Sequence, residues 1–289
     1  MISKDTFFSK KRTLNFAGTL YELTTPMVMG ILNITPDSFY EGSRYTSEAS
    51  VLQRCERILV DGGAIIDIGA YSSRPGAEHI SEEDELNRLV PALKMIRKTF
   101  PDALLSVDTF RANVAKIVVR DFGVQMINDI SAGTLDESMM ETVASLNVPY
   151  VMMHIKGDPR TMQQLTEYDD LIRDILKYFA EKVEKAKMAG VQDIIIDPGF
   201  GFGKTLEQNY QLLSRLSDLR IFELPVLVGI SRKSMIYKLL EITADNSLAG
   251  TVAVNTLALL NGANILRVHD VKEAVDTVKI VATYKNSYL

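Results

Sequence analysis

Residues 193–204 read Asp193-Ile194-Ile195-Ile196-Asp197-Pro198-Gly199-Phe200-Gly201-Phe202-Gly203-Lys204. Three consecutive isoleucines predict a short buried strand, and the Asp-Pro step followed by alternating glycines predicts that this strand stops abruptly in a tight loop. Because Pro198 favours an extended backbone in the residue before it, Asp197 is expected at the carboxyl end of the strand. Its carboxylate would then face whatever the loop encloses.

The glycine-rich loop resembles two phosphate-binding motifs but matches neither. Gly203-Lys204-Thr205 looks like the end of a P-loop, yet that motif has four residues between its first glycine and the Gly-Lys pair, and Gly199 leaves three. A dinucleotide-binding fingerprint fails as well, because the glycines follow a G-x-G-x-G pattern. The loop alone therefore does not indicate a nucleotide site.

Composition and charge exclude several classes of protein. A chain of 289 residues with 46% hydrophobic residues can bury a large core, and a net charge of −5 argues against nucleic acid or an anionic membrane as partner. The single cysteine, Cys55, cannot form an internal disulfide, and its helical context indicates core packing. No signal peptide and no run of roughly 20 apolar residues is evident, so we expect a soluble, cytoplasmic protein.

Apolar runs of strand length alternate with segments of helical periodicity. The runs are 27–32, 64–68, 103–107, 125–127, 150–153, 194–196, 225–228 and 265–268, and the helical segments are 47–61, 82–99, 111–122, 137–146, 168–189, 206–216, 233–240 with 248–261, and 271–284. Such alternation requires right-handed crossovers and a parallel sheet, and eight units in 289 residues predict an α/β fold of the (β/α)8 TIM barrel type. An open, doubly wound sheet is the structural alternative.

The segment before the repeat reads as a β-hairpin. Residues 13–23 contain two short strands around a turn at Ala17-Gly18. We expect this N-terminal hairpin, within residues 1–24, to cap one end of the barrel. No low-complexity segment or linker divides the chain, so residues 1–289 are predicted to form a single domain.

Polar side chains lie at or just beyond the carboxyl end of every predicted strand. They are Asn33, Asp67, Asp108, Asn128 with Asp129, His154, Asp197, Ser231 with Lys233, and Arg267 with His269. In an open sheet, ligand groups concentrate near a switch point, whereas a closed barrel brings all strand ends to one basin. The distribution therefore favours the barrel.

Two carboxylates and one amide suit a flat heterocycle. Asp108 and Asp197 can each accept two parallel hydrogen bonds, as the edge of an amino-pyrimidinone requires, and Asn128 offers both a donor and an acceptor. Asp108 could instead cap the helix that follows it, and Asn128 with Asp129 could form a plain turn. We expect ligand binding at both positions.

Cations follow the last two predicted strands. The run 229–234 leaves strand seven and enters a helix, a region that commonly holds phosphate in barrels. Lys233 could instead form a Schiff base, although a lysine beside Arg232 in a loop suits binding better. Arg267 and His269 alternate as strand residues do, so both are expected to point the same way and to bind an anion.

The loops 33–42 and 70–76 combine proline or glycine with hydroxyl groups and a charge. Such loops suit lids that close over a ligand and exclude water, and ordinary surface turns are the alternative. Their expected position at one end of the barrel favours lids.

From about Leu14 to its end, the chain resembles the dihydropteroate synthase family. The matching elements are 30–39, 73–76, 107–109, 128–130, 197–204, 231–233 and 267–269, and their combination in this order is highly specific. The resemblance implies a barrel enzyme of folate synthesis that joins 6-hydroxymethyl-7,8-dihydropterin pyrophosphate to 4-aminobenzoate and releases pyrophosphate with Mg²⁺. It further implies a homodimer and a target of sulfonamides.

The resemblance also implies roles for the matching positions. Pterin contacts are expected at Asp108, Asn128, Asp197 and Lys233; the pyrophosphate end at Arg267, His269 and Asn33, with Asn33 close to Mg²⁺; and the lid and aminobenzoate pocket at Ser73, Arg74, Pro75, Phe202 and Ser234. The catalytic groups are expected at Asp108, Asp197, Lys233, Arg267 and His269.

One element departs from the family pattern. The family commonly has Gly-Glu-Ser-Thr before Arg-Pro-Gly, whereas this chain has Ala70-Tyr71-Ser72-Ser73, which keeps a hydroxyl but places tyrosine where an acid is usual. Two alternatives share a similar barrel: a methyltetrahydrofolate-corrinoid methyltransferase, which needs no pyrophosphate pocket, and an inactive pterin-binding protein that serves a partner. The segments 73–76 and 267–269 argue against the first, and the complete set of ligand groups argues against the second.

Overall fold

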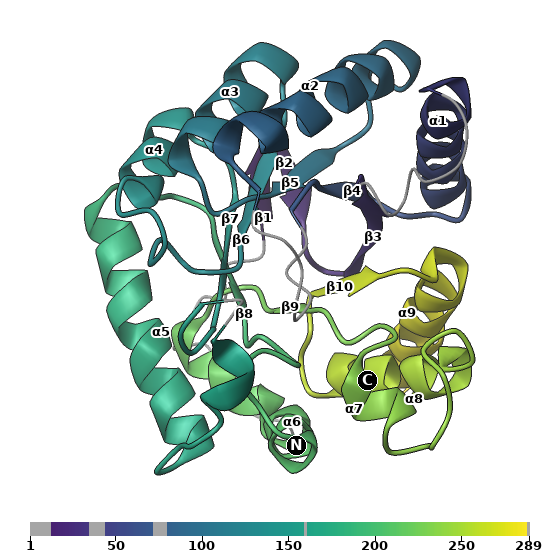
Figure 1. The fold of residues 1–289 in the computed structure, drawn as a ribbon. Coiled ribbons are helices and arrows are strands. Elements are labelled where there is room, and N and C mark those ends of the chain that lie inside the picture. Colours follow the sequence, from purple (N-terminus) through teal and green to yellow (C-terminus); the bar gives the residue numbers. More distant parts are fainter. Residues whose placement is uncertain (1–12, 35–43, 72–79, 159–160, 288–289) are drawn as a thin grey trace.

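The computed structural model describes residues 13–34, 44–71, 80–158 and 161–287. Its centre is a parallel sheet of eight strands in the order β8-β7-β6-β5-β4-β3-β10-β9 (Figure 1). The strands are β3 (Met27–Asn33), β4 (Ile65–Gly69), β5 (Leu105–Asp108), β6 (Met126–Asp129), β7 (Tyr150–Met153), β8 (Ile194–Asp197), β9 (Leu227–Val228) and β10 (Ile265–Val268).

The sheet closes on itself between β8 and β9. Ile196 forms a parallel bridge with Val226, and its N–H donates to the carbonyl of Pro225 over 3.0 Å. The predicted (β/α)8 barrel is therefore confirmed, and the open sheet is excluded.

The helices surround the strands as an outer ring (Figure 1). They are α1 (Arg44–Val60), α2 (Glu82–Thr99), α3 (Ala112–Phe122), α4 (Met139–Leu146), α5 (Leu171–Met188), α6 (Leu206–Ser214), α7 (Ser234–Tyr237), α8 (Leu248–Leu260) and α9 (Val271–Asn286), with 3₁₀ helices at Met162–Gln164 and Leu216–Phe222. Ser81 caps α2 in a capping box with Asp84.

The helix after β9 is shorter than predicted. The periodicity of 233–240 predicts a helix of two turns, but α7 ends at Tyr237. The chain then turns through Glu241, whose φ is +53°, and the Ile242 N–H donates to the Tyr237 carbonyl over 3.0 Å. The apolar pattern therefore continues in a turn rather than in a helix.

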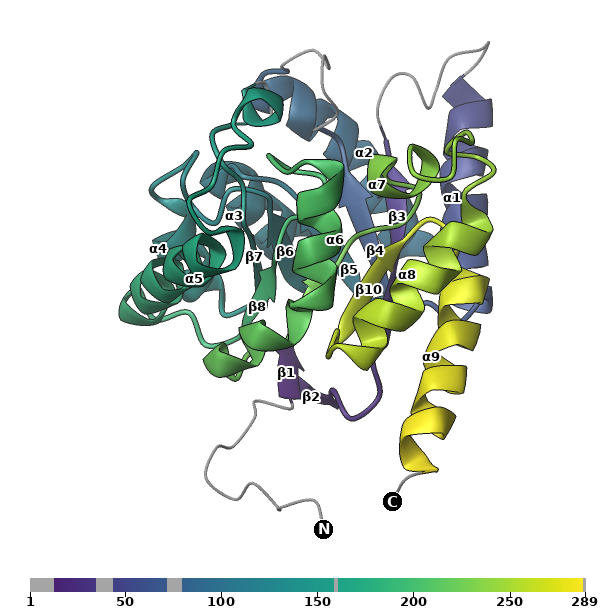
Figure 2. The same ribbon diagram turned by 90° about the horizontal axis from the view of Figure 1, so that it is seen from below.

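A hairpin closes the end of the barrel at which the strands begin (Figure 2). Strand β1 (Thr13–Phe16) pairs with β2 (Thr19–Glu22) around a turn at Ala17 and Gly18, both with positive φ. Leu14 and Phe16 are buried against apolar side chains that point into the barrel. The predicted hairpin cap is thus confirmed, and it leaves the opposite end of the barrel for the site.

No helix within the described ranges is both long enough and apolar enough to cross a membrane.

Candidate active site

Side chains that point into the barrel change from apolar to polar along the strands. Near the hairpin, Ile65, Ile195 and Ile265 are fully or almost fully buried in an apolar cluster. Side chains two residues apart on a strand face the same side. Two residues further along five of the strands stand Asp67, Ser106, Asn128, Asp197 and Arg267. An apolar floor therefore supports a polar layer that faces the carboxyl ends of the strands.

Arg267 lies at the centre of this polar layer. Its Nε donates to Asp67 Oδ2 over 2.6 Å, and one terminal nitrogen donates to Asp108 Oδ2 over 2.9 Å. Burial raises the pKa of Asp108, and the charge of Arg267 opposes that rise. Burial alone would lower the pKa of Arg267, but Asp67 and Asp108 raise it, so the guanidinium stays charged. The arginine thereby ties β4, β5 and β10 together inside the barrel.

Asp108 does not cap the following helix. The N-cap of α3 is Arg111, and the Ala112 N–H donates to Asp136 Oδ2 over 2.7 Å instead. Because Asp108 Oδ2 is bound to Arg267 and the side chain is 19% exposed, the carboxylate faces the open end of the barrel. The capping alternative is wrong.

The sequence leaves open whether Asn128 with Asp129 binds a ligand or forms a turn, and the structure gives each residue one of these roles. The Asn128 amide faces the interior and donates to Asp67 Oδ2 over 3.2 Å. Asp129 faces outward, where it accepts from the N–H groups of Ser131 and Gly133 and from the Tyr150 hydroxyl at distances of 2.6–2.7 Å. The turn is therefore made by Asp129, and Asn128 remains directed into the site.

The base of the polar layer contains buried polar atoms without a protein partner. Asp67 Oδ1 and Ser106 Oγ are fully buried and have no hydrogen-bond partner among the described residues. Buried polar atoms in folded proteins almost always have a partner, and exceptions are explained by water, ions or functional sites. Asp67 was expected near a strand end and had no predicted role. In the structure it is the middle residue of β4, and its side chain accepts hydrogen bonds from both Arg267 and Asn128.

The glycine-rich loop orients Asp197. The Gly199 N–H donates to Asp197 Oδ1 over 2.8 Å. A Cβ at Gly199 would lie 2.0 Å from the carbonyl oxygen of His154, so the loop can approach β7 this closely only with glycine. Burial raises the pKa of Asp197, and nearby Lys233 lowers it. The carboxylate is thus held at the strand end, as Pro198 and the glycines indicate.

Lys233 reaches over the same loop. Its Nζ donates to the carbonyl of Phe200 over 2.6 Å and lies 4.7 Å from the centre of the Phe202 ring. Burial lowers the pKa of Lys233 to about 8, against the charge of Asp197, which raises it. The ammonium is therefore charged at neutral pH and close to a carboxylate, an arrangement that suits binding rather than Schiff-base chemistry.

Lys204 is a buried cation that sequence reasoning missed. Its Nζ donates to the carbonyls of Gly199 and Phe202 over 2.8 and 2.9 Å, and lies 3.1 Å from Nδ1 of His154. Burial lowers the pKa of Lys204 to about 7. The lysine folds back into its own loop and fixes the loop's shape. The Gly-Lys pair was the only local signal, and it resembles the wrong motif.

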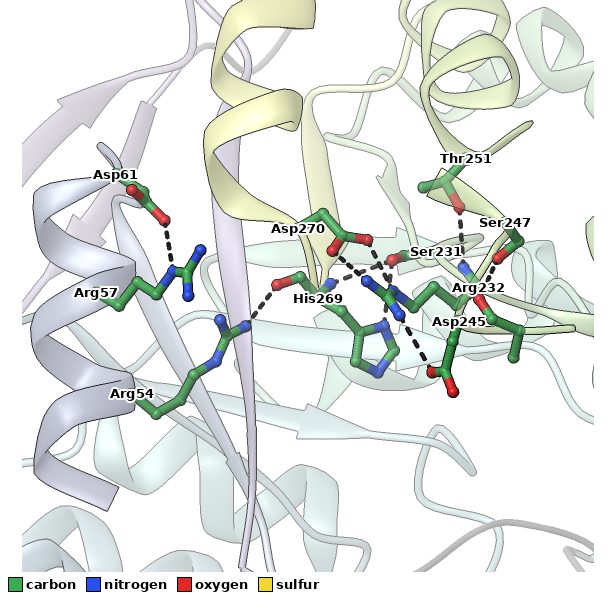
Figure 3. A network of polar contacts seen from close by, with 11 residues as sticks. Arg54, Arg57, Asp61, Ser231, Arg232, Asp245, Ser247, Thr251, His269 and Asp270 are labelled. Atoms are coloured by element: carbon green, nitrogen blue, oxygen red, sulfur yellow. Dashed lines mark hydrogen bonds and ion pairs between the residues drawn. The ribbon is translucent and has the colours of Figure 1, made fainter. Parts of the chain in front are cut away.

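The second group of cations lies at the rim, beside a cavity of about 640 Å³ between α1 and the ends of β3 and β10. Asn33, Arg54, Arg232 and His269 line it. Figure 3 shows Arg54, Arg232 and His269 with their polar contacts. His269 Nδ1 lies 3.1 Å from the Ser231 hydroxyl. Burial first and Arg267 second lower the pKa of His269 to about 4, so the ring is neutral at pH 7.

Apolar side chains form a wall beside the polar layer. Its members are Phe110, Ile130, Met153, Ile155 and Met162, with Tyr71 and Phe202 packed against them. The Tyr71 and Phe110 rings meet edge to face with centroids 5.2 Å apart, and the Arg111 guanidinium lies 4.8 Å from the Phe110 centroid. Tyr71, which stands where the family has an acid, is therefore part of an aromatic contact. The wall and the carboxylates together outline a site for a flat polar ring.

The structure brings together most of the predicted site residues. Asp108, Asn128, Asp197, Lys233 and Arg267 meet in the polar layer, and Asn33 and His269 lie at its rim. Ser234 begins α7 directly after Lys233 and is half-buried. Ser73, Arg74 and Pro75 lie outside the described residues, as does most of the predicted lid at 33–42.

Comparison with known proteins places the chain in one family. The family model described as "Pterin binding enzyme" matches residues 29–269. The dihydropteroate synthase of Escherichia coli (strain K12) is 41% identical over 266 residues, which cover 91% of this chain and 93% of that protein. The dihydropteroate synthase of Haemophilus influenzae is 40% identical and covers 90% of this chain and 94% of its own length.

Solved structures give the same result. The Yersinia pestis dihydropteroate synthase in complex with a sulfonamide drug superimposes with a TM-score of 0.88 at 43% identity, covering 95% of this chain and 99% of that one. The Xanthomonas albilineans dihydropteroate synthase with 4-aminobenzoic acid has a TM-score of 0.87 at 37% identity, with 95% and 98% covered. On its fold, its site and these relatives, the chain belongs to the dihydropteroate synthase family of pterin binding enzymes.

Proposed function

We propose that this chain condenses 6-hydroxymethyl-7,8-dihydropterin pyrophosphate with 4-aminobenzoate to give 7,8-dihydropteroate and pyrophosphate. The observation that carries this proposal is that carboxylates and cations share one end of one barrel, where Arg267 binds Asp108 and Lys233 lies near Asp197. A relative solved with 4-aminobenzoic acid and another solved with pteroic acid support the same pair of substrates.

The pterin ring would lie against the polar layer. Its amino-pyrimidinone edge presents adjacent N–H groups, which a carboxylate accepts in parallel. Asp197 is oriented for this by the Gly199 N–H, and Asn128 adds a donor and an acceptor. Lys233 would donate to an acceptor of the ring from the opposite side of the loop. The apolar wall would cover the face of the ring.

The diphosphate would lie toward Arg267, His269 and Asn33. Two nitrogens of Arg267 bind carboxylates, while its third makes no hydrogen bond to a described residue. The neutral His269 ring can donate one hydrogen bond without losing a proton. These groups would stabilise the charge that develops on the departing diphosphate, which is how preorganised donors act in catalysis.

Mg²⁺ fits this end by the chemistry of its donors. The ion prefers oxygen ligands and binds through one or two protein groups together with substrate phosphates and water. Asn33 ends β3 at the rim and offers an amide oxygen, so it would hold the ion jointly with the diphosphate. Bound there, Mg²⁺ would neutralise part of the diphosphate charge.

The reaction needs no strong base from the protein. The methylene carbon loses its diphosphate, and the electron-rich pterin delocalises the positive charge. The neutral amine of 4-aminobenzoate then attacks the methylene carbon with its lone pair, and the ammonium that forms loses one proton to the released diphosphate or to water. The protein therefore contributes mainly position and exclusion of water. Catalytic roles are proposed for Asp108, Asp197, Lys233, Arg267 and His269.

The amine would enter beside the glycine-rich loop. The Lys233 ammonium lies over the Phe202 ring, and Ser234 is the first residue of α7, directly after Lys233. By resemblance, Ser73, Arg74 and Pro75 would complete this pocket. Sulfonamides, which resemble the amine and are bound by the Yersinia pestis relative, are expected to compete here.

We also propose a homodimer in the cytoplasm. Exposed apolar side chains lie three or four residues apart on adjacent helices: Leu257 and Leu260 on α8, and Ile280 and Tyr284 on α9. Such a stripe on each of two neighbouring helices suits a self-complementary contact. Sedimentation of the wild type and of an Ile280→Glu variant would test it: a dimer that the glutamate dissociates supports the contact, and a wild-type monomer contradicts it.

Turnover tests the proposed reaction. The purified chain should release pyrophosphate from the pterin pyrophosphate in the presence of Mg²⁺ and 4-aminobenzoate, with dihydropteroate formed in equal amount. Release that does not depend on the amine would indicate a hydrolase. Binding of the pterin without release would indicate a pterin-binding protein, and either result would contradict the proposal.

A further inference from the structure

The buried Ser231 hydroxyl contacts His269 twice. Its Oγ accepts the backbone N–H of His269 over 3.1 Å, and it lies 3.1 Å from the ring nitrogen Nδ1 of the same residue (Figure 3). Ser231 is only 4% exposed, so water reaches this hydroxyl poorly. His269 also lines the cavity at the rim and is one of the residues toward which the diphosphate is proposed to lie.

The positions of the protons follow from what each group can donate and accept. A hydroxyl has one proton to donate and can accept two hydrogen bonds. Ser231 Oγ already accepts the backbone N–H, and Nδ1 is the only acceptor for its proton among the described residues. If Nδ1 carried a proton, the buried Ser231 hydroxyl would be left with no acceptor, which is unfavourable. The geometry therefore favours a proton on Nε2 and none on Nδ1.

The surrounding arginines hold the His269 backbone in place. Arg54 donates to the His269 carbonyl over 2.6 Å and to the Ile31 carbonyl over 3.2 Å. Arg232 binds both carboxylate oxygens of Asp270 over 2.9 and 2.7 Å, and Figure 3 shows these contacts on either side of the histidine. The His269 N–H, the His269 carbonyl and the Asp270 side chain are therefore all held by hydrogen bonds. With the backbone fixed, the contact with Ser231 determines which ring nitrogen of His269 carries the proton.

We infer that Ser231 is a positioning residue that holds His269 as the neutral tautomer with its proton on Nε2, so that Nε2–H donates a hydrogen bond to the diphosphate. The identity of the acceptor rests on the proposed function; the tautomer does not. Burial, which lowers the pKa of His269 to about 4, agrees with a neutral ring. A neutral imidazole N–H is a donor but not a general acid, so His269 would stabilise the leaving group without protonating it.

Nitrogen NMR tests the tautomer directly. The chain has three histidines, so ¹⁵N-histidine labelling gives few ring signals, and a His269→Gln variant assigns the relevant one. At pH 7, we expect a protonated Nε2 and an unprotonated Nδ1. Ser231→Ala should give a mixture of tautomers, and Ser231→Thr, which keeps the hydroxyl, should restore the wild-type pattern. A protonated Nδ1 in the wild type, or an unchanged pattern in Ser231→Ala, would overturn the inference.

A matched variant separates this role from simple loss of a buried hydroxyl. Ser247 is fully buried nearby and donates to the Ala244 carbonyl over 2.6 Å, without a hydrogen bond to His269. Ser247→Ala should leave the His269 signals unchanged. Titration with inorganic pyrophosphate should show binding about 3- to 10-fold weaker in Ser231→Ala, as expected for one hydrogen bond, and near wild type in Ser247→Ala and Ser231→Thr. Equal weakening in both alanine variants would contradict the inference.

The outcomes also separate the inference from the proposed function. If Ser231→Ala does not fold, the wild-type spectrum alone decides the tautomer. Absence of dihydropteroate in the turnover assay would contradict the reaction but would leave the NMR result standing. A wrong tautomer would contradict the role of Ser231 and leave the reaction standing.

Discussion

At the scale of single residues, Arg267 is the group that holds the site together. Its partners Asp67 and Asp108 come from two other strands, and Asp67 is completely buried. Removing one member of a buried ion pair leaves an uncompensated charge, which is more damaging than losing an exposed pair. The same arginine is proposed to bind diphosphate, so its loss should affect stability and catalysis together.

Arg267→Ala should lower the free energy of unfolding by about 3–5 kcal/mol, because the fully buried Asp67 and the partly buried Asp108 both lose their cation. Arg215→Ala is the control, since Arg215 pairs with Asp218 at the surface and its side chain is 59% exposed. We expect a loss of about 0–1 kcal/mol for the control. Urea denaturation measures both, and equal losses would show that the Arg267 pairs are not the stabilising contacts we describe.

Lys204 predicts a dependence of stability on pH. Burial lowers its pKa from 10.5 to about 7 in the folded chain. Between these values the unfolded state binds the extra proton, so the Lys204 contribution to stability is least favourable below pH 7 and improves as the pH rises. Relative to Lys204→Met, wild-type stability should therefore increase between pH 7 and 9, by at most about 1.4 kcal/mol per pH unit.

Urea denaturation of both proteins at several pH values measures this trend. Lys272→Met serves as the control, because Lys272 is exposed on α9 and pairs there with Asp276. Its difference from wild type should stay flat between pH 7 and 9. A flat difference for Lys204→Met as well would mean that Lys204 is not deprotonated by burial.

At the scale of elements, the glycine-rich loop after β8 sets the position of Asp197, Lys204 and Lys233. Its backbone supplies an N–H to Asp197 and carbonyls to both lysines. Gly199 has a φ of +70° and lies against the carbonyl of His154 at the end of β7. Glycine is therefore required at this position for two reasons: the backbone is left-handed, and the His154 carbonyl leaves no room for a Cβ.

Gly199→Ala should strain the left-handed backbone, displace the His154 carbonyl and lower turnover sharply. Gly123→Ala is the matched control, because Gly123 has a φ of +62° but no atom within 4 Å of where its Cβ would lie. Both variants pay the left-handed penalty of about 1–2 kcal/mol, and only Gly199→Ala must displace the His154 carbonyl. Unfolding and turnover measurements showing equal effects in both variants would contradict this account of the loop.

At the scale of the whole molecule, the hairpin lies at the end of the barrel opposite the site. The hairpin and the apolar floor close one end, and the polar layer occupies the other. Changes in the hairpin should therefore act on folding rather than on the reaction.

Leu14→Ala should lower the free energy of unfolding by about 2–5 kcal/mol, because Leu14 is fully buried under the barrel. Leu20, on the other strand of the hairpin, is 67% exposed, and Leu20→Ala should change stability by less than about 0.5 kcal/mol. The kcat of folded Leu14→Ala protein should stay near wild type. A large loss of kcat would show that the hairpin supports the site directly.

Most of the fold could be predicted because its signals are local and repeat along the chain. Strand runs, helical periodicity and strand-end polar residues recur in each unit, so Asp108, Asn128, Asp197 and Arg267 were expected at one end. Pairing was not predictable: Arg267 binds Asp67 across 200 positions, and only closure of the barrel brings them together. The burial of Lys204 was missed for the same reason, since the contact of its Nζ with His154 joins residues 50 positions apart.

The most direct test of the central claim is to titrate the two halves of the proposed substrate separately. Asp197→Asn should weaken binding of 6-hydroxymethyl-7,8-dihydropterin by at least about tenfold, as for loss of a charge-assisted hydrogen bond, and leave inorganic pyrophosphate binding near wild type. His269→Ala should do the reverse. If both variants weakened the same half, or neither half bound to the wild type, a single basin with a ring end and a leaving-group end would be contradicted.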